Sequence, residues 1–599
     1  MMRGPIRTLV DTPEEKAKDQ RQVLTRLLGL LKPYRGQVML AFGMVILSAT
    51  TQGLGPYLIG LAVDDFISQG DRSGLATIVL FLAGVYLVNM VATRFQIFWM
   101  AKAGQNLLAD LREHVFRKLQ RLSLQYLEGK QAGELISRLI NDIDALSSFF
   151  SQSLTQMIGA IFSIIGIMVA MLAINWRLGL AVLVVVPVLW VVTRLFSAWA
   201  RMAFRKTRTT IGDVSANLEE ELGGVKIAQA FSRTDENVRR FAERNAANRD
   251  ANISANAVTS AFAPAMDILS ALDLALVAAL GGWFVVRGVA SLGTMIAFIQ
   301  YVQNFFRPIQ TVAQLWTSAQ SAFAAAERVF ELLDVEEIVT DFPDAEPIEE
   351  ILGRVTFENV SFSYSQEDEV LRNVSFTVEA GQRVAIVGPT GAGKTTIIGL
   401  IARFYDPQSG TVRIDGKNVR YLKQRSLRAQ MGMVSQEPFL FSGTIFENIR
   451  YGRLDASEEE VVIAAQAANA NEFISRQPEG YQTDVGERGK LLSQGQRQLI
   501  SIARAILANP RILIMDEATA SIDTRTELLI TKAMGNLLSG RTSFIIAHRL
   551  STVRNADLVL VIDNGEIVES GTHANLIEAG KLYSDLYRRQ FFPLEKLPG

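Results

Sequence analysis

A glycine-rich run in the second half of the chain has the composition of a phosphate-binding loop. Residues 388–395 read Gly-Pro-Thr-Gly-Ala-Gly-Lys-Thr and fit the pattern G-x-x-x-x-G-K-[ST] in full. The strand-like run 383–387 precedes them and a helix-like run follows, which is the context that this motif requires. Glycines let backbone N–H groups close around phosphates, Lys394 would reach the β- and γ-phosphates of ATP, and the Thr395 hydroxyl would bind Mg²⁺. The candidate nucleotide-binding residues of this loop are Gly388, Pro389, Thr390, Gly391, Ala392, Gly393, Lys394, Thr395 and Thr396.

Two adjacent carboxylates follow an apolar run further along the chain. Residues 512–515 are Ile-Leu-Ile-Met, and Asp516 and Glu517 come directly after them. Four apolar residues of this kind predict a buried strand, so the carboxylates should lie where that strand ends. Asp516 is placed to hold Mg²⁺, and Glu517 is placed to polarise an attacking water as a general base. With the phosphate-binding loop upstream, the pair predicts hydrolysis of ATP.

The first half of the chain is much more apolar than a soluble protein of this size needs. Apolar runs of about 20 residues can cross the hydrocarbon core of a bilayer, which is roughly 30 Å thick. The sixth such run is less apolar than the others, and its assignment depends partly on the family resemblance described below. We expect membrane-spanning helices near 37–63, 75–101, 152–175, 178–200, 260–287 and 292–318.

Basic residues in the connections between these runs indicate how the chain is oriented. The stretches 102–150 and 201–250 are rich in Lys and Arg, whereas the other connections carry one Arg each. By the positive-inside rule, these two stretches and both termini are expected in the cytoplasm. The polar first 20 residues lack the apolar core of a secretory signal, so internal segments should direct the chain to the membrane.

Length and composition set the domain plan and exclude several functions. The chain has 599 residues, with 60 Lys and Arg against 61 Asp and Glu, so no basic field for nucleic acid exists. The absence of Cys excludes disulfides and thiolate metal sites. We expect an all-α six-helix transmembrane domain followed by an α/β P-loop ATPase domain. The expected segments are 1–36, cytoplasmic with an interfacial helix; 37–334, transmembrane; 335–352, an acidic linker; and 353–599, nucleotide-binding. The alternative for the helix in the first segment is an ordinary helix that enters the first span.

Polar residues within the expected spans are candidates for a substrate pathway. Asp267 and Asp273 fall in the fifth span, where a carboxylate is by default a functional hypothesis. Six residues turn a helix through about 600°, so the two do not share a face. The alternative is that each pairs with an Arg or meets water. In the sixth span a polar stripe predicts a cavity lining, with hydrogen bonding between helices as the alternative; it comprises Gln300, Gln303, Asn304, Arg307 and Gln314.

Further motifs of the second half resemble those of the ABC ATPases. Residues 492–496 (Leu-Ser-Gln-Gly-Gln) resemble the ABC signature, and Gln436, Asp523 and His548 match three other family elements in order. Tyr364 resembles the aromatic residue that stacks on adenine. With the apolar runs ahead of this domain, the chain from about residue 20 to 590 resembles a bacterial multidrug or lipid-A type half-transporter.

The resemblance implies that two ATPase domains close head to tail around ATP and Mg²⁺. Ser493, Gly495 and Gln496 would then contact the nucleotide held by the P-loop of the partner chain. Gln436 would sense Mg²⁺ and the attacking water, and His548 would contact the γ-phosphate. The metal ligands implied by residue type and resemblance are Thr395, Gln436 and Asp516. Short cytoplasmic helices are expected around 123–129 and 213–223, and 483–489 resembles a segment that touches the membrane domain.

One departure from the family pattern concerns the partner. The usual signature is Leu-Ser-Gly-Gly-Gln, and Gln494 replaces its first glycine while Gly495 is retained. In related exporters this variant resembles the half that pairs with a different chain, so a heterodimer is favoured, with a homodimer as the alternative.

We expect ATP-driven export of an amphipathic, drug-like or lipid-like compound by alternating access. The protein would be a multi-pass component of the cell membrane, with its ATPase domain in the cytoplasm. The alternative is an ATP-gated channel or regulator, but the short segment 335–352 offers no regulatory insertion. A soluble ABC ATPase is disfavoured by the apolar runs. Drug, lipid, peptide and metal-chelate pumps share this architecture, so the sequence does not separate their substrates.

Overall fold

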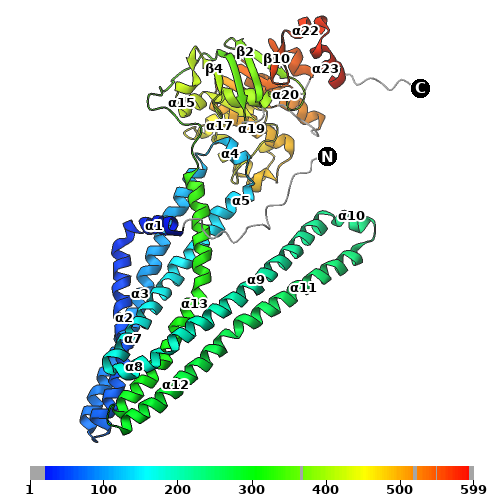
Figure 1. Ribbon diagram of the computed structural model, residues 1–599. Helices are drawn as coiled ribbons and strands as arrows, with labels where there is room; N and C mark the ends of the chain where they lie inside the picture. Colours follow the sequence, from blue (N-terminus) through cyan, green and yellow to red (C-terminus); the bar gives the residue numbers. More distant parts are fainter. Residues whose placement is uncertain (1–19, 365–368, 517–522, 548–549, 592–599) are drawn as a thin grey trace. The chain divides into compact units, whose positions relative to one another are not determined.

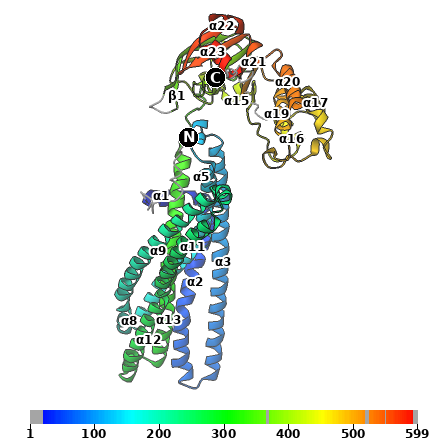
Figure 2. The same ribbon diagram turned by 90° about the vertical axis from the view of Figure 1, so that its right-hand side faces the viewer.

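The structure is a computed structural model that describes residues 20–364, 369–516, 523–547 and 550–591 (Figures 1 and 2). The chain divides into two compact units. One unit comprises Met1–Gln120 and Gln131–Val335, and the other comprises Arg121–Lys130 and Glu336–Gly599. Residues 121–130 therefore belong to the second unit although they lie within the first half of the sequence.

The first unit is built from helices, several of which are long. They are α1 (Gln20–Leu30), α2 (Arg35–Leu61), α3 (Arg72–Leu119), α5 (Ala132–Ser137), α6 (Ile143–Ser148), α7 (Leu154–Ile174), α8 (Trp176–Leu183), α9 (Val185–Gly223), α10 (Val225–Ala230), α11 (Thr234–Ser260), α12 (Phe262–Val286) and α13 (Leu292–Asp334). At 1.5 Å per residue, the 48 residues of α3 extend about 72 Å, well beyond a bilayer core of about 30 Å.

Five helical stretches in the described part of the chain are long and apolar enough to cross a membrane. They are Lys32–Ile67, Arg72–Leu119, Ala132–Ile174, Trp176–Gly223 and Thr234–Val286, and they contain the first five expected spans almost completely. The sixth expected span lies in α13, which has 43 residues and is long enough but is not one of these five. Its polar stripe explains its lower hydropathy.

Helix α1 is separate from the first span. Lys32–Tyr34, which includes Pro33, forms a short 3₁₀ turn before α2 begins, since proline lacks the N–H needed to continue a helix. Val23, Leu27 and Leu31 are buried, whereas Leu24 and Leu28 are exposed. Arg26 binds both oxygens of Asp334, at 2.5 and 2.8 Å, so α1 is fixed to the end of α13.

The two short helices expected in the cytoplasmic stretches have different outcomes. The first is confirmed as α4 (Leu124–Glu128), which begins after the cap Ser123. The second prediction, over 213–223, is wrong because those residues are the last part of α9. The short helix is α10, after Gly224, and its loop joins α9 to the neighbouring α11 (Figure 1). The consecutive glycines Gly223 and Gly224 mark the point where α9 ends.

The second unit has two sheets. A four-stranded antiparallel sheet has the order β2-β1-β4-β5, from β1 (Val355–Ser363), β2 (Glu369–Val378), β4 (Ser409–Ile414) and β5 (Lys417–Asn418). A six-stranded sheet has the order β10-β9-β3-β8-β7-β6, from β3 (Arg383–Val387), β6 (Met431–Val434), β7 (Ile512–Asp516), β8 (Thr542–Ile546), β9 (Leu558–Asp563) and β10 (Glu566–Gly571). All its pairs are parallel except β9 with β10. The expected α/β class is confirmed.

Helices cover both faces of the six-stranded sheet. They are α14 (Lys394–Ile401), α15 (Gln424–Ala429), α16 (Ile445–Arg450), α17 (Glu458–Ala467), α18 (Asn471–Ile474), α19 (Gln494–Ala508), α20 (Thr524–Leu538), α21 (Leu550–Arg554), α22 (His573–Ala579) and α23 (Leu582–Phe591).

Strand β7 shows which helix lies on which face. Ile512 and Ile514 join the hydrophobic cluster that contains the buried side of α14. Leu513 and Met515 join the cluster that contains α19. Successive side chains of a strand point to opposite faces of a sheet, so α14 and α19 lie on opposite faces.

Candidate ATP-binding site

The glycine-rich loop connects β3 to α14, and two of its glycines have conformations that only glycine adopts easily. Gly391 has φ +86° and Gly393 has φ +104°. A Cβ at Gly393 would lie 2.6 Å from Leu371 Cδ2 and 3.1 Å from the Val370 carbonyl oxygen, whereas a Cβ at Gly391 would meet no atom within 4 Å. Gly393 is thus required by both conformation and space, and Gly391 by conformation alone.

Lys394 is the first residue of α14, and its side chain folds back over the loop. Its Nζ donates hydrogen bonds to the carbonyl oxygens of Gly388 (2.9 Å) and Pro389 (2.8 Å). Burial lowers the pKa of Lys394, and the negative charge of Asp516 works in the opposite direction. The first N–H groups of a helix have no partner within it, and together with this ammonium they form a site suited to phosphate.

The candidate metal ligands and catalytic groups follow neighbouring strands of the same sheet. Asp516 is the half-buried last residue of β7, and the exposed Gln436 comes two residues after β6. These strands run parallel to β3, so their carboxyl ends lie at the edge of the sheet where the P-loop begins. Glu517 and His548 lie outside the described residues.

Mg²⁺ fits the residue types gathered at this edge. Thr395, Gln436 and Asp516 offer a hydroxyl, an amide and a carboxylate oxygen, and hard divalent cations prefer oxygen ligands. Thr395 is exposed at the start of α14, where its hydroxyl is accessible from solvent. With a single carboxylate among them, these donors suit an ion that completes its shell with phosphate and water.

Tyr364, the candidate adenine-stacking residue, is held by several side chains. Its hydroxyl lies 3.0 Å from Thr396 Oγ1 in α14. Its ring meets Tyr405 edge-on, with centroids 5.3 Å apart. Gln408 accepts a hydrogen bond from the Ser363 N–H (2.6 Å) and donates one to the Ser363 carbonyl (2.8 Å), which fixes the end of β1.

Two residues of α4 also contact this region, and the sequence did not predict them. Gln125 Nε2 donates a hydrogen bond to the Tyr364 carbonyl oxygen. The Tyr405 hydroxyl donates one to Glu128, at 3.1 Å. The sequence feature that could have indicated these contacts is the run Arg-Phe-Tyr-Asp-Pro at 403–407. Its charged and aromatic residues directly follow the P-loop helix.

The signature residues form the start of α19. Ser493 is its N-cap: the Ser493 hydroxyl accepts from the Gln496 N–H (3.3 Å), and Gln496 Oε1 accepts from the Ser493 N–H (2.9 Å). Gln494 is half-buried at the first helical position, and Gly495 is buried. The helices that begin at the signature and at the P-loop thus pack in different hydrophobic clusters, on opposite faces of the sheet.

In the membrane unit the two candidate carboxylates differ. Asp267 is exposed, whereas Asp273 is 3% exposed, and neither of its oxygens has a hydrogen-bond partner among the described residues. In the polar stripe of α13, Gln303, Asn304 and Arg307 are exposed. Asp273 therefore fits neither the ion-paired nor the water-exposed alternative.

The fold and the site together define a membrane transport protein that contains its own ATP-binding domain. The family model described as "ABC transporter transmembrane region" matches residues 38–309, and that described as "ABC transporter" matches residues 371–520. The chain belongs to the ABC transporter family, and its ATPase activity is coupled to transport across the membrane.

Individual relatives match most of this chain. It is 41% identical to the uncharacterized ABC transporter ATP-binding protein YfiC of Bacillus subtilis, over 96% of this chain and 95% of the relative. It is 43% identical to the fatty acid ABC transporter ATP-binding/permease protein of Mycobacterium bovis, over 81% of this chain and 76% of the relative. A solved structure of a bacterial Atm1-family ABC exporter with ATP bound is 32% identical, with a TM-score of 0.77, covering 94% and 99% of the two chains.

Proposed function

We propose that this chain is one half of a dimeric exporter that moves an amphipathic, drug-like or lipid-like compound across the membrane by alternating access. The placement of α14 and α19 on opposite faces of one sheet is the observation that carries this proposal. A single chain presents its P-loop and its signature on separate surfaces, so a second chain can complete each ATP site. The name of the fatty acid transporter among the relatives supports a lipid-like substrate.

The site residues have distinct proposed roles in hydrolysis. The P-loop amides and Lys394 hold the phosphates of ATP, and Tyr364 supports adenine. Glu517 orients and deprotonates the attacking water, while Gln436 and His548 contact the water and the γ-phosphate. Mg²⁺, when bound by Thr395, Gln436 and Asp516, would neutralise charge that develops on the phosphates.

The proposed exporter half has four segments. We propose 1–36 as the N-terminal segment, 37–334 as the membrane domain, 335–352 as the connection and 353–599 as the ATPase domain. Gln494 supports a heterodimer, because this variant of the signature resembles the half that pairs with a different chain in related exporters. Each complex would then contain one strong and one weak ATP site.

Reconstitution tests transport directly. We would purify the tagged complex gently, identify a copurifying second subunit by mass spectrometry, and place the complex in vesicles with a nitrobenzoxadiazole-labelled fatty acid. We expect ATP-dependent movement of the label, its loss in Lys394→Ala, and its retention in Lys532→Ala, which removes an exposed lysine of α20. ATP-dependent ion conductance without movement of amphipathic compounds would favour a channel instead. A homodimer as the only active species would contradict the heterodimer.

A further inference from the structure

A short loop after the P-loop helix contains a fully buried arginine. The loop, Ala402–Asp406, is called the junction loop below, and its Arg403 is 0% exposed with φ +51°. The Phe404 N–H donates to the Gly399 carbonyl oxygen (2.8 Å), and Arg428 donates to the carbonyl oxygens of Ala402 (3.1 Å) and Arg403 (2.7 Å). The loop is therefore fixed to the end of α14, opposite the end that forms the phosphate site.

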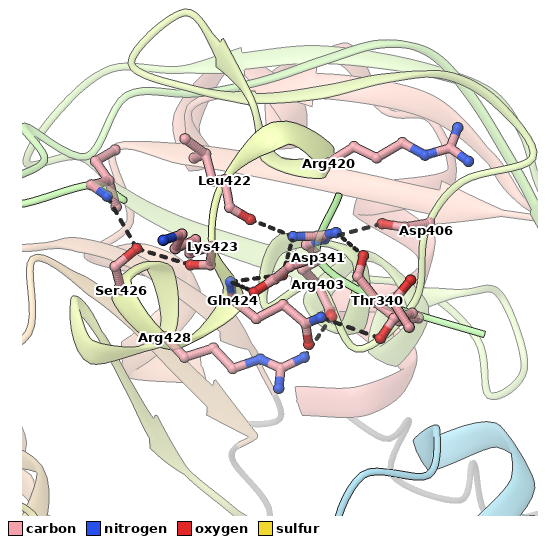
Figure 3. Close-up of polar contacts among 12 residues, drawn as sticks. Thr340, Asp341, Arg403, Asp406, Arg420, Leu422, Lys423, Gln424, Ser426 and Arg428 are labelled. Carbon is pink, nitrogen blue, oxygen red and sulfur yellow. Dashed lines mark hydrogen bonds and ion pairs between the residues drawn. The ribbon is translucent and has the colours of Figure 1, made fainter. Parts of the chain in front are cut away.

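Arg403 ties the junction loop to the segment that follows α13 (Figure 3). Its guanidinium donates to Asp341 Oδ1 (3.1 Å) and to the Thr340 carbonyl oxygen (2.9 Å), and also to Asp406 and the Leu422 carbonyl. A buried arginine needs such acceptors, because an unpaired charge in the interior is costly. The contacts thus hold residues 340–341, in the connection from the membrane domain, against the ATPase core.

A second set of bonds holds the same connection. Asp341 accepts from the Gln424 N–H (3.1 Å), and Gln424 Nε2 donates to the Val339 carbonyl oxygen (3.2 Å). Further along, the Ile348 N–H donates to Ser426 Oγ (3.0 Å). The connection is thus held along several residues, and Arg403 is the point at which it meets the end of the P-loop helix.

Tyr405 ties the junction loop to the other segment that comes from the membrane domain. Its hydroxyl donates to Glu128 in α4, and its ring packs against Tyr364, whose hydroxyl is 3.0 Å from Thr396 in α14. The ring lies against Gly399, where a Cβ would come within 2.9 Å of it. Two residues of one loop, Arg403 and Tyr405, thus contact the two segments, the connection and α4, by which the membrane helices join this unit.

We propose that the junction loop transmits the occupancy of the phosphate site to both segments, with Arg403 and Tyr405 as positioning residues for transport-coupled ATP hydrolysis. Phosphate binding fixes the first turn of α14, and an eight-residue helix passes that constraint to its far end as a rigid body. From there the Arg403–Asp341 pair acts on the connection, and the Tyr405–Glu128 bond acts on α4. The inference rests on the ATPase activity and not on the identity of the transported compound.

Hydrogen–deuterium exchange of the full-length protein tests this inference without a known substrate. The nucleotide would be adenylyl imidodiphosphate with Mg²⁺, which is not hydrolysed at its β–γ bridge. We expect it to slow exchange about tenfold in peptides covering the P-loop, α4 and residues 339–349. In Glu128→Ala, the slowing in α4 should be lost while that in the P-loop and in 339–349 remains. In Asp341→Asn, which removes the negative charge that faces the Arg403 guanidinium, the slowing in 339–349 should be weakened while that in α4 remains.

The variants were chosen so that folding does not decide the outcome. Glu128 and Asp341 are both exposed, and an Asn at 341 can still accept the Gln424 N–H. Tyr405→Phe removes only the hydroxyl and should behave as Glu128→Ala does. Tyr481→Phe is the matched control, because it removes a comparable hydroxyl bond, to Asn471 at 2.7 Å, elsewhere in the unit.

Two results would overturn the inference. In one, nucleotide protects the P-loop of the wild-type protein but leaves α4 and 339–349 unchanged. In the other, Glu128→Ala and Asp341→Asn retain the full nucleotide-dependent slowing, as the Tyr481→Phe control should. Arg403 and Tyr405 would then only stabilise the fold.

Discussion

Replacing Gly393 with alanine tests whether the observed P-loop conformation is what binds ATP. A non-glycine residue in a left-handed conformation costs about 1–2 kcal/mol. The new Cβ would also lie 2.6 Å from Leu371 Cδ2 and 3.1 Å from the Val370 carbonyl. Leu371 can rotate but the carbonyl belongs to strand β2, so overpacking adds about 1–3 kcal/mol. Together these give a cost of about 2–5 kcal/mol.

This cost should appear mainly as weaker ATP binding. If the loop moves to relieve the contact, its amides no longer match the phosphates, and each 1.4 kcal/mol lowers affinity about tenfold. We therefore expect affinity for ATP to fall by about 30-fold or more. Titration of the full-length protein with trinitrophenyl-ATP, displaced by ATP, measures this directly.

Two glycine variants separate strain from crowding and from location. Gly391→Ala introduces the same kind of strain within the loop, but its Cβ meets nothing within 4 Å. Gly381→Ala does so at φ +81° in the turn before β3, outside the loop and also in open space. Affinity should fall most in Gly393→Ala, less in Gly391→Ala and not at all in Gly381→Ala. Unchanged affinity in Gly393→Ala, or an equal loss in all three variants, would refute the reasoning.

Three further substitutions, with Ser457→Ala as a control, address hydrolysis, the signature and the membrane unit. Glu517→Gln should reduce the rate of ATP hydrolysis by about 100-fold or more while ATP binding is unchanged. Hydrolysis is measured by phosphate release in a complex whose partner site is also disabled. A normal rate there would exclude Glu517 as the general base. Ser493→Ala and Ser457→Ala each remove one capping box, which is worth about 0.5–2 kcal/mol. Both variants should therefore have a slightly lower melting temperature. Only Ser493→Ala should also lower ATPase activity. Asp273→Leu should raise the melting temperature, since each buried oxygen without a partner costs about 1–3 kcal/mol. A lower melting temperature would reveal a partner for Asp273, and lost transport of cationic compounds would place it in the substrate pathway.

The sequence predicts those parts of the molecule that depend on local pattern. Five apolar runs became long helices because burial in lipid requires about 20 apolar residues whatever their neighbours are. The P-loop was predictable because its glycines and Lys394 act within eight consecutive residues. By contrast, hydropathy alone does not identify α13 as a membrane span, because its polar stripe lowers the mean hydropathy of the helix.

Contacts between distant segments could not be predicted in this way. Nothing in the composition of α4 indicates that Gln125 meets the Tyr364 carbonyl, 239 residues later in the chain. Similarly, the sequence alone does not distinguish Arg403 from an ordinary surface arginine. Only in the folded chain do Asp341 and backbone carbonyl oxygens surround it. Such pairs arise only when tertiary packing brings the segments together, so charge alone does not reveal them.

The position of Gln494 shows how helix formation and phosphate binding compete at the signature. Gln494 is the first residue of α19, directly after the cap Ser493. Glutamine is a good helix former, whereas glycine costs up to about 1 kcal/mol within a helix, so the change from glycine favours the helix. Gln494 directly precedes the buried Gly495, which the family resemblance places against the ATP of a partner chain. In the proposed head-to-tail dimer, any loss would fall on the ATP held by the partner and not on the chain's own P-loop. If the partner is an unlike chain, as proposed, this one substitution would make the two ATP sites unequal while Lys394 and Asp516 of this chain remain intact.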